Sequence, residues 1–463
     1  MTLIKSISGI RGTIGGRPGD NLTPIDVVKF TAAYGTYIKQ KAGNRRCKVV
    51  VGRDARISGA MVEQLVCATL VGLGIDVVNA GLSTTPTVEM AVTEVEADGG
   101  IILTASHNPK QWNALKLLNA AGEFISAADG QRILDIAGHE SFTFAGVDEL
   151  GQVVSTNFDD MHIRKILELP LVNLKAIQAA RFTVAIDAVN SVGGIIVPKL
   201  LQALGVREII PLYCTPDGRF PHNPEPLPEH LSDISQLVKD KMADVGFVVD
   251  PDVDRLAIVC EDGSMFGEEY TLVAVADYVL SKTPGNTVSN LSSSRALKDV
   301  TEKYGQQYFA SAVGEVNVVE KMKQVNAIIG GEGNGGVIYP ALHYGRDALV
   351  GIALFLSHLA ESKLTCSALR KMYPAYVISK NKIELTPDID LDSIFAAVKR
   401  EYSQCPQNDS DGLRIDFENE WVHLRRSNTE PIIRIYAESA TASSADKLAQ
   451  QIIEKVKMLV GIA

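Results

Sequence analysis

Apolar strands alternate with helical segments three times along the chain, and this repeat limits the possible folds more than any other feature. The first copy predicts strands at Lys48–Val51, Ile75–Val78 and Gly99–Leu103, with a helix over Gly59–Gly72. Strands that alternate with helices form parallel βαβ units. Each copy therefore predicts one α/β domain.

The next two copies repeat the order of elements but not the letters. Their strands are expected at 182–186, 205–210 and 244–249, then at 286–290, 307–310 and 327–329, with helices ending at Leu204, Tyr304 and Lys321. After the expected linker Tyr373-Pro374 the pattern changes to α+β, with strands at 375–385, 413–417, 421–425 and 431–437 and helices at 391–402 and 445–459.

A chain of 463 residues is too long for one small core. We expect three similar α/β domains with mixed sheets and a smaller α+β carboxyl-terminal domain around a central cleft. The expected bounds are 1–155, 156–257, 258–372 and 373–463. The most unusual polar loop of each α/β copy follows a strand, at the edge where ligands bind in such domains.

Composition excludes several functional classes. A net charge of −10 argues against nucleic acid or an anionic membrane as a partner. The six cysteines form no Cys-x-x-Cys pair, which favours reduced thiols in the cytoplasm. The amino terminus has no signal-like segment, and the longest apolar run, Ala348 to Leu356, is too short to span a bilayer.

The first copy ends in the turn Thr104-Ala-Ser-His-Asn-Pro109. Pro109 disfavours a helical Asn108, so the strand must stop in a turn that lifts Ser106 to the carboxyl edge of the sheet. A serine there can be a nucleophile, a helix cap or a plain turn residue. The turn alone leaves all three open.

The second copy ends in Asp250-Pro-Asp-Val-Asp-Arg255, with carboxylates at alternate positions. In an extended turn this spacing aims several oxygens at one hard cation. An EF-hand is excluded, because Arg255 stands where that loop requires glycine and strands flank the segment. The alternative is a solvated acidic turn. Since the turn lies between two buried strands, we expect a metal site at Asp250, Asp252 and Asp254.

The third copy ends in Gly331-Glu-Gly-Asn-Gly-Gly336, which formally matches a dinucleotide fingerprint. Glu332 would face a pyrophosphate unfavourably, and no ribose-binding acid follows at the expected distance. Glu332 and Asn334 instead offer hydrogen-bonding groups that suit sugar hydroxyls.

Basic residues mark three further places. Arg425-Arg-Ser-Asn-Thr-Glu-Pro431 suits a phosphate dianion, with an exposed polar hairpin as the alternative. Arg11 lies in the glycine-rich turn Gly9-Ile-Arg-Gly12, where an ordinary surface arginine is also expected. Lys116 interrupts an apolar run and is either snorkelling or placed for function.

Taken in order, these four loops together with Lys116 resemble the signature loops of the α-D-phosphohexomutase superfamily, over essentially the whole chain. The resemblance implies four domains around a cleft. It implies that Ser106 carries a phosphoryl group and that Ser106, Asp250, Asp252 and Asp254 hold one Mg²⁺ per chain.

The resemblance also assigns the remaining residues. Lys116, Arg11, His107 and Arg255 join Ser106 in the catalytic group, with Lys116 proposed for proton transfer. Substrate would be bound by the sugar-loop residues and by the carboxyl-terminal domain, through Glu332, Asn334, Arg425, Ser427, Asn428, Thr429 and Arg434.

The implied reaction interconverts hexose 6-phosphate and hexose 1-phosphate through a phosphoserine enzyme and a 1,6-bisphosphate of glucose or a hexosamine. Many relatives have histidine at Gly336 and serine at Asn334, and this variant loop favours phosphoglucosamine mutase over phosphoglucomutase/phosphomannomutase. A Mg²⁺-dependent sugar phosphatase or a sugar-phosphate-binding regulator could use the same loops. The expected protein is a cytoplasmic monomer or homodimer.

Overall fold

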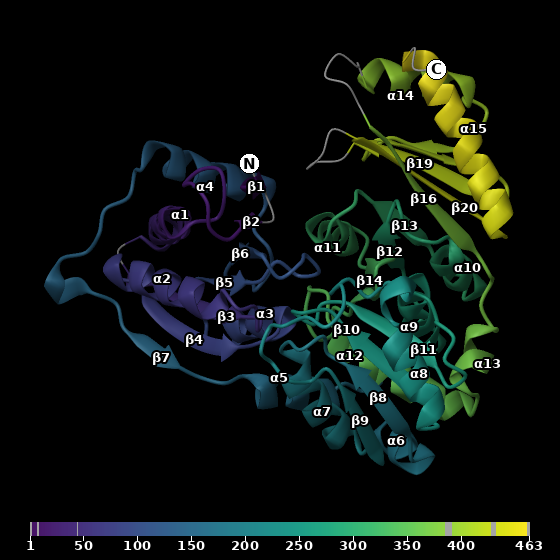
Figure 1. Ribbon diagram of the computed structural model, residues 1–463, viewed down its shortest axis with the longest axis horizontal. Helices are drawn as coiled ribbons and strands as arrows, with labels where there is room; N and C mark the ends of the chain where they lie inside the picture. The colour runs from purple at the N-terminus through teal and green to yellow at the C-terminus, as the bar shows by residue number, and fades with distance from the viewer. Residues whose placement is uncertain (1, 7–8, 44, 385–390, 427–431, 461–463) are drawn as a thin grey trace.

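The computed structural model describes residues 2–6, 9–43, 45–384, 391–426 and 432–460, which form four sheets with their helices (Figure 1). The first sheet has the order β1-β2-β6-β5-β3-β4-β7. Its strands are β1 (Ile4–Ser6), β2 (Gly9–Thr13), β3 (Lys48–Arg53), β4 (Asp76–Leu82), β5 (Gly99–Leu103), β6 (Trp112–Leu118) and β7 (Val153–Ser155).

The second and third sheets repeat one part of the first. Their orders, β11-β10-β8-β9 and β15-β14-β12-β13, match β6-β5-β3-β4. In all three, parallel strands are followed by one antiparallel strand after the third. The added strands are β8 (Thr183–Asp187), β9 (Glu208–Leu212), β10 (Val245–Val249), β11 (Leu256–Cys260), β12 (Thr287–Asn290), β13 (Tyr308–Ser311), β14 (Ile329–Glu332) and β15 (Gly336–Ile338).

This repeat confirms the three similar α/β domains with mixed sheets. It also shows where the polar loops lie: each connects the third strand of the repeated unit to the antiparallel strand that follows. The Ser106 turn joins β5 to β6, the aspartate loop joins β10 to β11, and the glycine-rich loop joins β14 to β15.

Helices cover both faces of the sheets. In the first domain α1, α2 and α4 pack on one face and α3 on the other. The helices of the three domains are α1 (Pro24–Ala42), α2 (Gly59–Gly72), α3 (Thr85–Glu94), α4 (Ala127–His139), α5 (Asp159–Leu167), α6 (Leu174–Ala180), α7 (Gly193–Leu204), α8 (Ser232–Asp240), α9 (Glu268–Lys282), α10 (Ala296–Lys303), α11 (Glu315–Gln324), α12 (Ala348–Ser362) and α13 (Cys366–Arg370). Short 3₁₀ turns occupy Val147–Glu149 and Pro228–His230.

The apolar run that begins at Ala348 forms α12, which is buried over most of its length and starts at an Asp347 cap. One continuous apolar core contains α12, α9 and the second sheet, and it extends into the third domain. The first domain has separate cores of its own. The second and third domains are therefore packed as one block.

The carboxyl-terminal domain is an antiparallel sheet of order β16-β20-β19-β18-β17 packed against two helices. Its elements are β16 (Val377–Glu384), α14 (Leu391–Glu401), β17 (Gln407–Asn408), β18 (Leu413–Asp416), β19 (Trp421–Arg426), β20 (Ile432–Ser439) and α15 (Ala442–Val460). Its contacts with the third domain include Val313 N–H to Asp411 at 3.0 Å and Arg414 to the carbonyl of Leu291 at 2.6 Å.

Arg11 and the domain boundary at residue 257 differ from the sequence-based expectation, and the structure also shows which element carries Lys116. Arg11 lies in strand β2 and not in a turn, because β2 pairs with the distant strand β6. The segment containing Lys116 is that strand β6. Strand β11 runs through residue 257, where the sequence analysis placed a domain boundary, because it pairs with β10 along its whole length.

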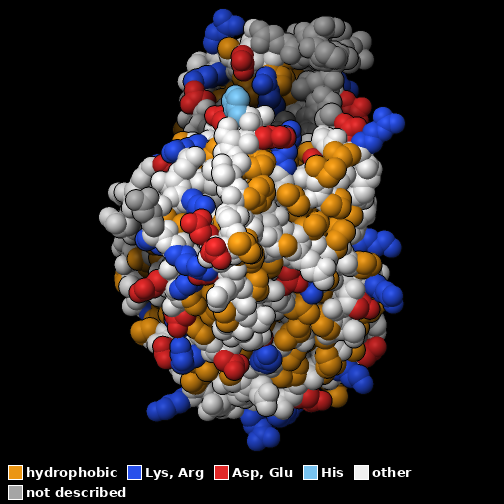
Figure 2. All heavy atoms as spheres, turned by 90° about the vertical axis from the view of Figure 1, so that its left-hand side faces the viewer, with side chains coloured by type: hydrophobic (Ala, Val, Ile, Leu, Met, Phe, Trp, Pro, Cys, Tyr) orange, Lys and Arg blue, Asp and Glu red, His pale blue; other side chains and the backbone are white. Residues whose placement is uncertain are grey.

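Figure 2 views the molecule from the side of strand β7, and hydrophobic side chains are scattered among charged ones on this face. Val147, Val153 and Val154, in the segment that leads to and forms β7, are exposed. Within the described residues, no helix has the length and apolar character needed to cross a bilayer.

The close packing of β5 against α1 gives a stability prediction. A Cβ on Gly99 would lie 2.1 Å from the Tyr34 hydroxyl and 2.7 Å from the Leu118 carbonyl, whereas a Cβ on Gly138 in α4 meets nothing within 4 Å. Gly99→Ala should therefore lower the free energy of unfolding by about 1–3 kcal/mol. Gly138→Ala should raise it by about 0.5–1 kcal/mol, because alanine favours a helix. Denaturant melts of both variants check the opposite signs.

Candidate active site

Ser106 is held in an unusual backbone conformation at the end of β5. Its φ is +47°, in the left-handed region, and its N–H donates to Thr104 Oγ1 at 2.9 Å. Thr104 in turn donates to the buried carboxylate of Asp54 at 2.7 Å. The Ser106 hydroxyl donates to Asp250 Oδ2 at 2.7 Å. The turn therefore presents Ser106 to the aspartate loop of the second domain, and the serine does not cap a helix.

Arg56 fixes the same turn from behind. It is fully buried and pairs with Asp54 at 2.9 Å. Its guanidinium also donates to four backbone carbonyls of the turn, those of Ser106, Asn108, Pro109 and Trp112. Arg56 belongs to none of the motifs predicted from the sequence. The signal that could have found it is its place in the segment after β3, the parallel neighbour of β5.

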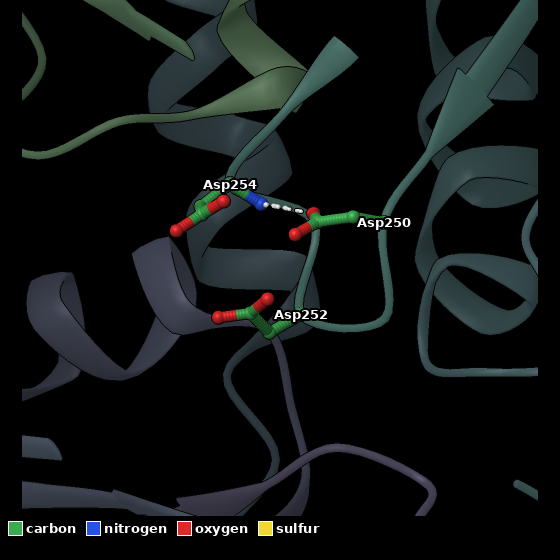
Figure 3. Close-up of side chains that lie close together, drawn as sticks. All are labelled: Asp250, Asp252 and Asp254. Carbon is green, nitrogen blue, oxygen red and sulfur yellow. Dashed lines mark hydrogen bonds between the residues drawn. The ribbon is translucent and has the colours of Figure 1, made fainter. Parts of the chain in front are cut away.

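The three aspartates of the β10–β11 loop are completely buried, and their carboxylates face one another (Figure 3). One oxygen from each lies within 4.8 Å of the others. No other such acidic, histidine or cysteine cluster occurs in the described part of the chain. Because the loop joins two strands and is buried, it is neither an EF-hand nor a solvated turn.

Each carboxylate is oriented by its neighbours. Asp250 Oδ1 accepts the N–H groups of Asp254 and Arg255, both at 3.2 Å. Asp252 Oδ2 accepts from Thr85 at 2.6 Å and from Lys116 at 2.7 Å. Asp252 Oδ1 and Asp254 Oδ1 are buried without a hydrogen-bond partner. Two fixed oxygens without donors, beside a third carboxylate, fit a hard divalent cation such as Mg²⁺.

The electrostatics agree with a cation site. Burial and the charges of Asp254 and Asp252 raise the pKa of Asp250 well above its usual value. Burial would also raise the pKa of Asp252, but the ammonium of Lys116 outweighs it and lowers that pKa. Burial opposes the charge on Lys116, and the carboxylates of Asp252 and Asp254 reverse this and raise its pKa. Lys116 is therefore held as a cation and is not snorkelling.

His107 and Arg255 lie beside this cluster. His107 Nδ1 is 3.4 Å from the Ser106 hydroxyl, and the charge of Arg255, together with burial, lowers the pKa of His107 well below its usual value. The histidine is therefore neutral at pH 7. Arg255 is mostly buried, and its Nε has no hydrogen-bond partner. It can add a donor for an anionic group.

Arginines of the first and last domains influence one another. Burial and the like charge of Arg434 lower the pKa of Arg11, whose Nε is buried without a hydrogen-bond partner. Arg434 and Arg425 are direct cross-strand neighbours in β20 and β19. Like charges opposite each other in a sheet are unfavourable, and Asp411, 3.7 Å from the Arg425 Nε, compensates part of this charge. Ser427, Asn428 and Thr429 lie outside the described residues.

The glycine-rich loop connects two strands, so it is not a dinucleotide fingerprint, which requires a helix after the glycines. Glu332 Oε1 accepts from Asn290 at 2.8 Å and from the Gly314 N–H at 3.0 Å. Its Oε2 accepts from Arg346 at 2.7 Å. Asn334 Oδ1 accepts the Gly336 N–H at 3.2 Å. Arg346 belongs to no sequence motif and was not predicted from the sequence.

Family models match nearly the whole chain in order. Domains I, II and III of the description "Phosphoglucomutase/phosphomannomutase, alpha/beta/alpha" match residues 3–144, 160–263 and 267–376, and the C-terminal domain of that family matches residues 385–455. The chain belongs to the phosphoglucomutase/phosphomannomutase family. It is therefore a phosphohexomutase-type isomerase of the α-D-phosphohexomutase superfamily, which confirms the resemblance.

Curated relatives and solved structures agree with this membership. A phosphoglucomutase/phosphomannomutase of Thermococcus kodakarensis is 33% identical over 97% of this chain and 98% of its own length. A probable phosphoglucosamine mutase of Pyrococcus abyssi is 33% identical over 98% and 96%. The crystal structure of a phosphoglucomutase/phosphomannomutase family protein from Burkholderia thailandensis has a TM-score of 0.85 and 25% identity, covering 99% of this chain and 98% of that one.

The Arg56 contacts give a prediction that separates Arg56 from Arg53, the last residue of β3. Arg56→Met should lower the free energy of unfolding by about 3–5 kcal/mol, because it leaves the buried Asp54 charge without its cationic partner and several buried carbonyls without a donor. Arg53 makes one ion pair, with Glu63 at 2.7 Å. Arg53→Met should cost about 1–2 kcal/mol. Equal losses of unfolding free energy for the two variants in denaturant melts would contradict the conclusion that Arg56 holds the Ser106 turn.

Proposed function

We propose that this protein is a phosphoglucosamine mutase that works through a phosphorylated Ser106. The observation that carries the proposal is the contact between the Ser106 hydroxyl and Asp250 at 2.7 Å, which joins the turn of one domain to the acidic cluster of another. The sugar assignment is supported by the Glu332 and Asn334 loop and by relatives named as probable phosphoglucosamine mutases. Phosphoglucomutase/phosphomannomutase activity is the alternative within the same family.

The proposed reaction moves one phosphoryl group at a time. The bond between phosphorus and Ser106 Oγ breaks while a bond to one sugar hydroxyl forms, and one net proton passes from that hydroxyl to Ser106. The resulting bisphosphorylated sugar turns over and returns its other phosphoryl group to Ser106. In-line positioning and charge neutralisation provide most of the catalysis in such a transfer.

Each residue has a defined part in this proposal. Asp250, Asp252 and Asp254, with the phosphate on Ser106, would hold one Mg²⁺, which neutralises phosphate oxygens when bound. Lys116 stays protonated beside Asp252 and can donate a proton to the Ser106 oxygen as the phosphoryl group leaves. Arg11 and Arg255 add positive charge near the reacting phosphate, and neutral His107 can bind its oxygens through an N–H.

Substrate binding is divided between two domains. Glu332 and Asn334 would contact the sugar hydroxyls, and the cross-strand pair Arg425 and Arg434 would hold the phosphate that does not react, with Ser427, Asn428 and Thr429. Because this phosphate site would make no contact with the sugar, either end of the bisphosphate could bind there in the same way. We also propose that the enzyme works in the cytoplasm and that glucose or hexosamine 1,6-bisphosphate activates it.

The proposed reaction is tested by measuring the intact mass of the protein and by identifying the sugar-phosphate product. Wild type incubated with glucose 1,6-bisphosphate should gain one phosphate and should isomerise glucosamine 6-phosphate faster than glucose or mannose 6-phosphate. Ser106→Ala should lose both the added phosphate and the activity, while Ser126→Ala, at the exposed start of α4, keeps them. Release of inorganic phosphate without isomerised sugar would instead make the protein a phosphatase.

The metal assignment predicts a change in stability without turnover. Mg²⁺ should raise the melting temperature of the wild type, because an ion that binds only the folded state stabilises it. Asp250→Asn should melt higher than the wild type in EDTA, since it removes one of three crowded carboxylates, and should respond little to Mg²⁺. The control Asp217→Asn changes an exposed acid of the same domain. An unchanged Mg²⁺ response in Asp250→Asn would argue against this site.

A further inference from the structure

Arg346 lies between the aspartate loop and the glycine-rich loop and is bonded to both. Its Nη2 donates to Asp254 Oδ2 at 2.6 Å, and its Nη1 donates to Glu332 Oε2 at 2.7 Å. Glu315, the first residue of α11, pairs with its Nε at 3.2 Å and accepts its backbone N–H at 2.9 Å. One buried guanidinium therefore links three carboxylates that belong to three separate segments.

The path of the Arg346 side chain requires glycine at position 336. A Cβ on Gly336 would lie 2.3 Å from Arg346 Cδ and 3.0 Å from its Cγ. Any side chain at 336 would have to displace the arginine. This contact gives a physical reason for glycine at position 336.

The residues before and after Arg346, Gly345 and Asp347, are both closely packed against other segments. Gly345 packs so closely on Glu89 of α3 that a Cβ there would lie 1.9 Å from a carboxylate oxygen. Asp347 caps α12 and accepts from His162 at 2.9 Å. The arginine is thus placed by backbone that cannot shift without disturbing its neighbours.

These contacts leave acceptor positions open on two of the carboxylates that Arg346 binds. Arg346 occupies Asp254 Oδ2, so Asp254 Oδ1, which has no hydrogen-bond partner, is the oxygen left for a cation. Glu332 receives three hydrogen bonds, and a carboxylate has about four acceptor positions, so one remains on Oε2 for a sugar hydroxyl.

We propose that Arg346 is a positioning residue that directs Asp254 toward the cation and Glu332 toward the sugar, so that the two binding events depend on each other. The sugar half of this proposal rests on the function proposed above. The cation half rests on the Asp254 contact alone.

The first test measures Mg²⁺ binding by calorimetry, without turnover. Arg346→Met should weaken Mg²⁺ binding by about 10–100-fold, as is usual when a residue that orients a metal ligand is lost. Arg346→Lys should recover part of this loss. Arg370→Met is the matched control, because Arg370 binds the Phe266 carbonyl and the Tyr270 ring away from the acidic cluster. Wild-type Mg²⁺ affinity in Arg346→Met would overturn the cation half.

The second test measures how much the binding of a sugar phosphate changes the affinity for Mg²⁺. Glucosamine 6-phosphate should tighten Mg²⁺ binding in the wild type and in Arg370→Met, and should do so at least several-fold less in Arg346→Met. In kinetics, Arg346→Met should raise KM about tenfold and narrow the kcat/KM ratio between glucosamine 6-phosphate and glucose 6-phosphate, because Glu332 loses the donor that holds its Oε2. Undiminished coupling together with an unchanged ratio would overturn the sugar half.

A third test displaces the Arg346 side chain without removing it, so that a loss of stability can be traced to its packing. Gly336→Ala should displace Arg346 and lower the melting temperature by several degrees, and the same change in an Arg346→Ala background should lower it much less. Equal shifts in both backgrounds would overturn the packing argument. If the wild type isomerises no hexose phosphate, the proposed function fails, and the Mg²⁺ titrations and this double-mutant cycle still decide the role of Arg346.

Discussion

Three carboxylates buried within 4.8 Å of one another are the constraint around which the domains are assembled. Crowded anions without water are unfavourable unless cations and donors compensate them. The chain supplies these from several segments: Lys116 and Thr85 from the first domain, Arg346 from the third, and backbone N–H groups from the loop itself. The acidic loop can therefore be stable only where these segments meet.

The distribution of apolar core explains which parts of the site are fixed to each other. The second and third domains share one core, so the aspartate loop and the glycine-rich loop belong to one block. The first domain brings Ser106 and Lys116 to Asp250 and Asp252 of this block, on a sheet with cores of its own. The carboxyl-terminal domain also has its own core and is tied to the third domain by polar contacts. The groups that we propose to bind the two ends of a substrate thus lie on separately packed units.

The same small topology used three times has a chemical consequence. An antiparallel strand after the third strand turns each functional loop into a hairpin connection held at both ends. Ser106 can then adopt a positive φ, and three aspartates can stay buried, because both flanking strands hold the backbone. A loop that was not flanked by two paired strands would relax to a conformation without a positive φ or buried carboxylates.

Local sequence was sufficient for the repeated α/β pattern, the four polar loops and the residue types that bind a cation, because strand hydrophobicity, proline and glycine act over a few residues. It placed Arg11 in a turn and did not single out Arg56 or Arg346. Those roles depend on contacts between distant segments, such as Arg11 opposite Ala114 and Arg346 against Asp254 and Gly336. Only the tertiary structure brings such pairs together, since no spacing along the chain records which carbonyl or carboxylate a buried arginine will meet.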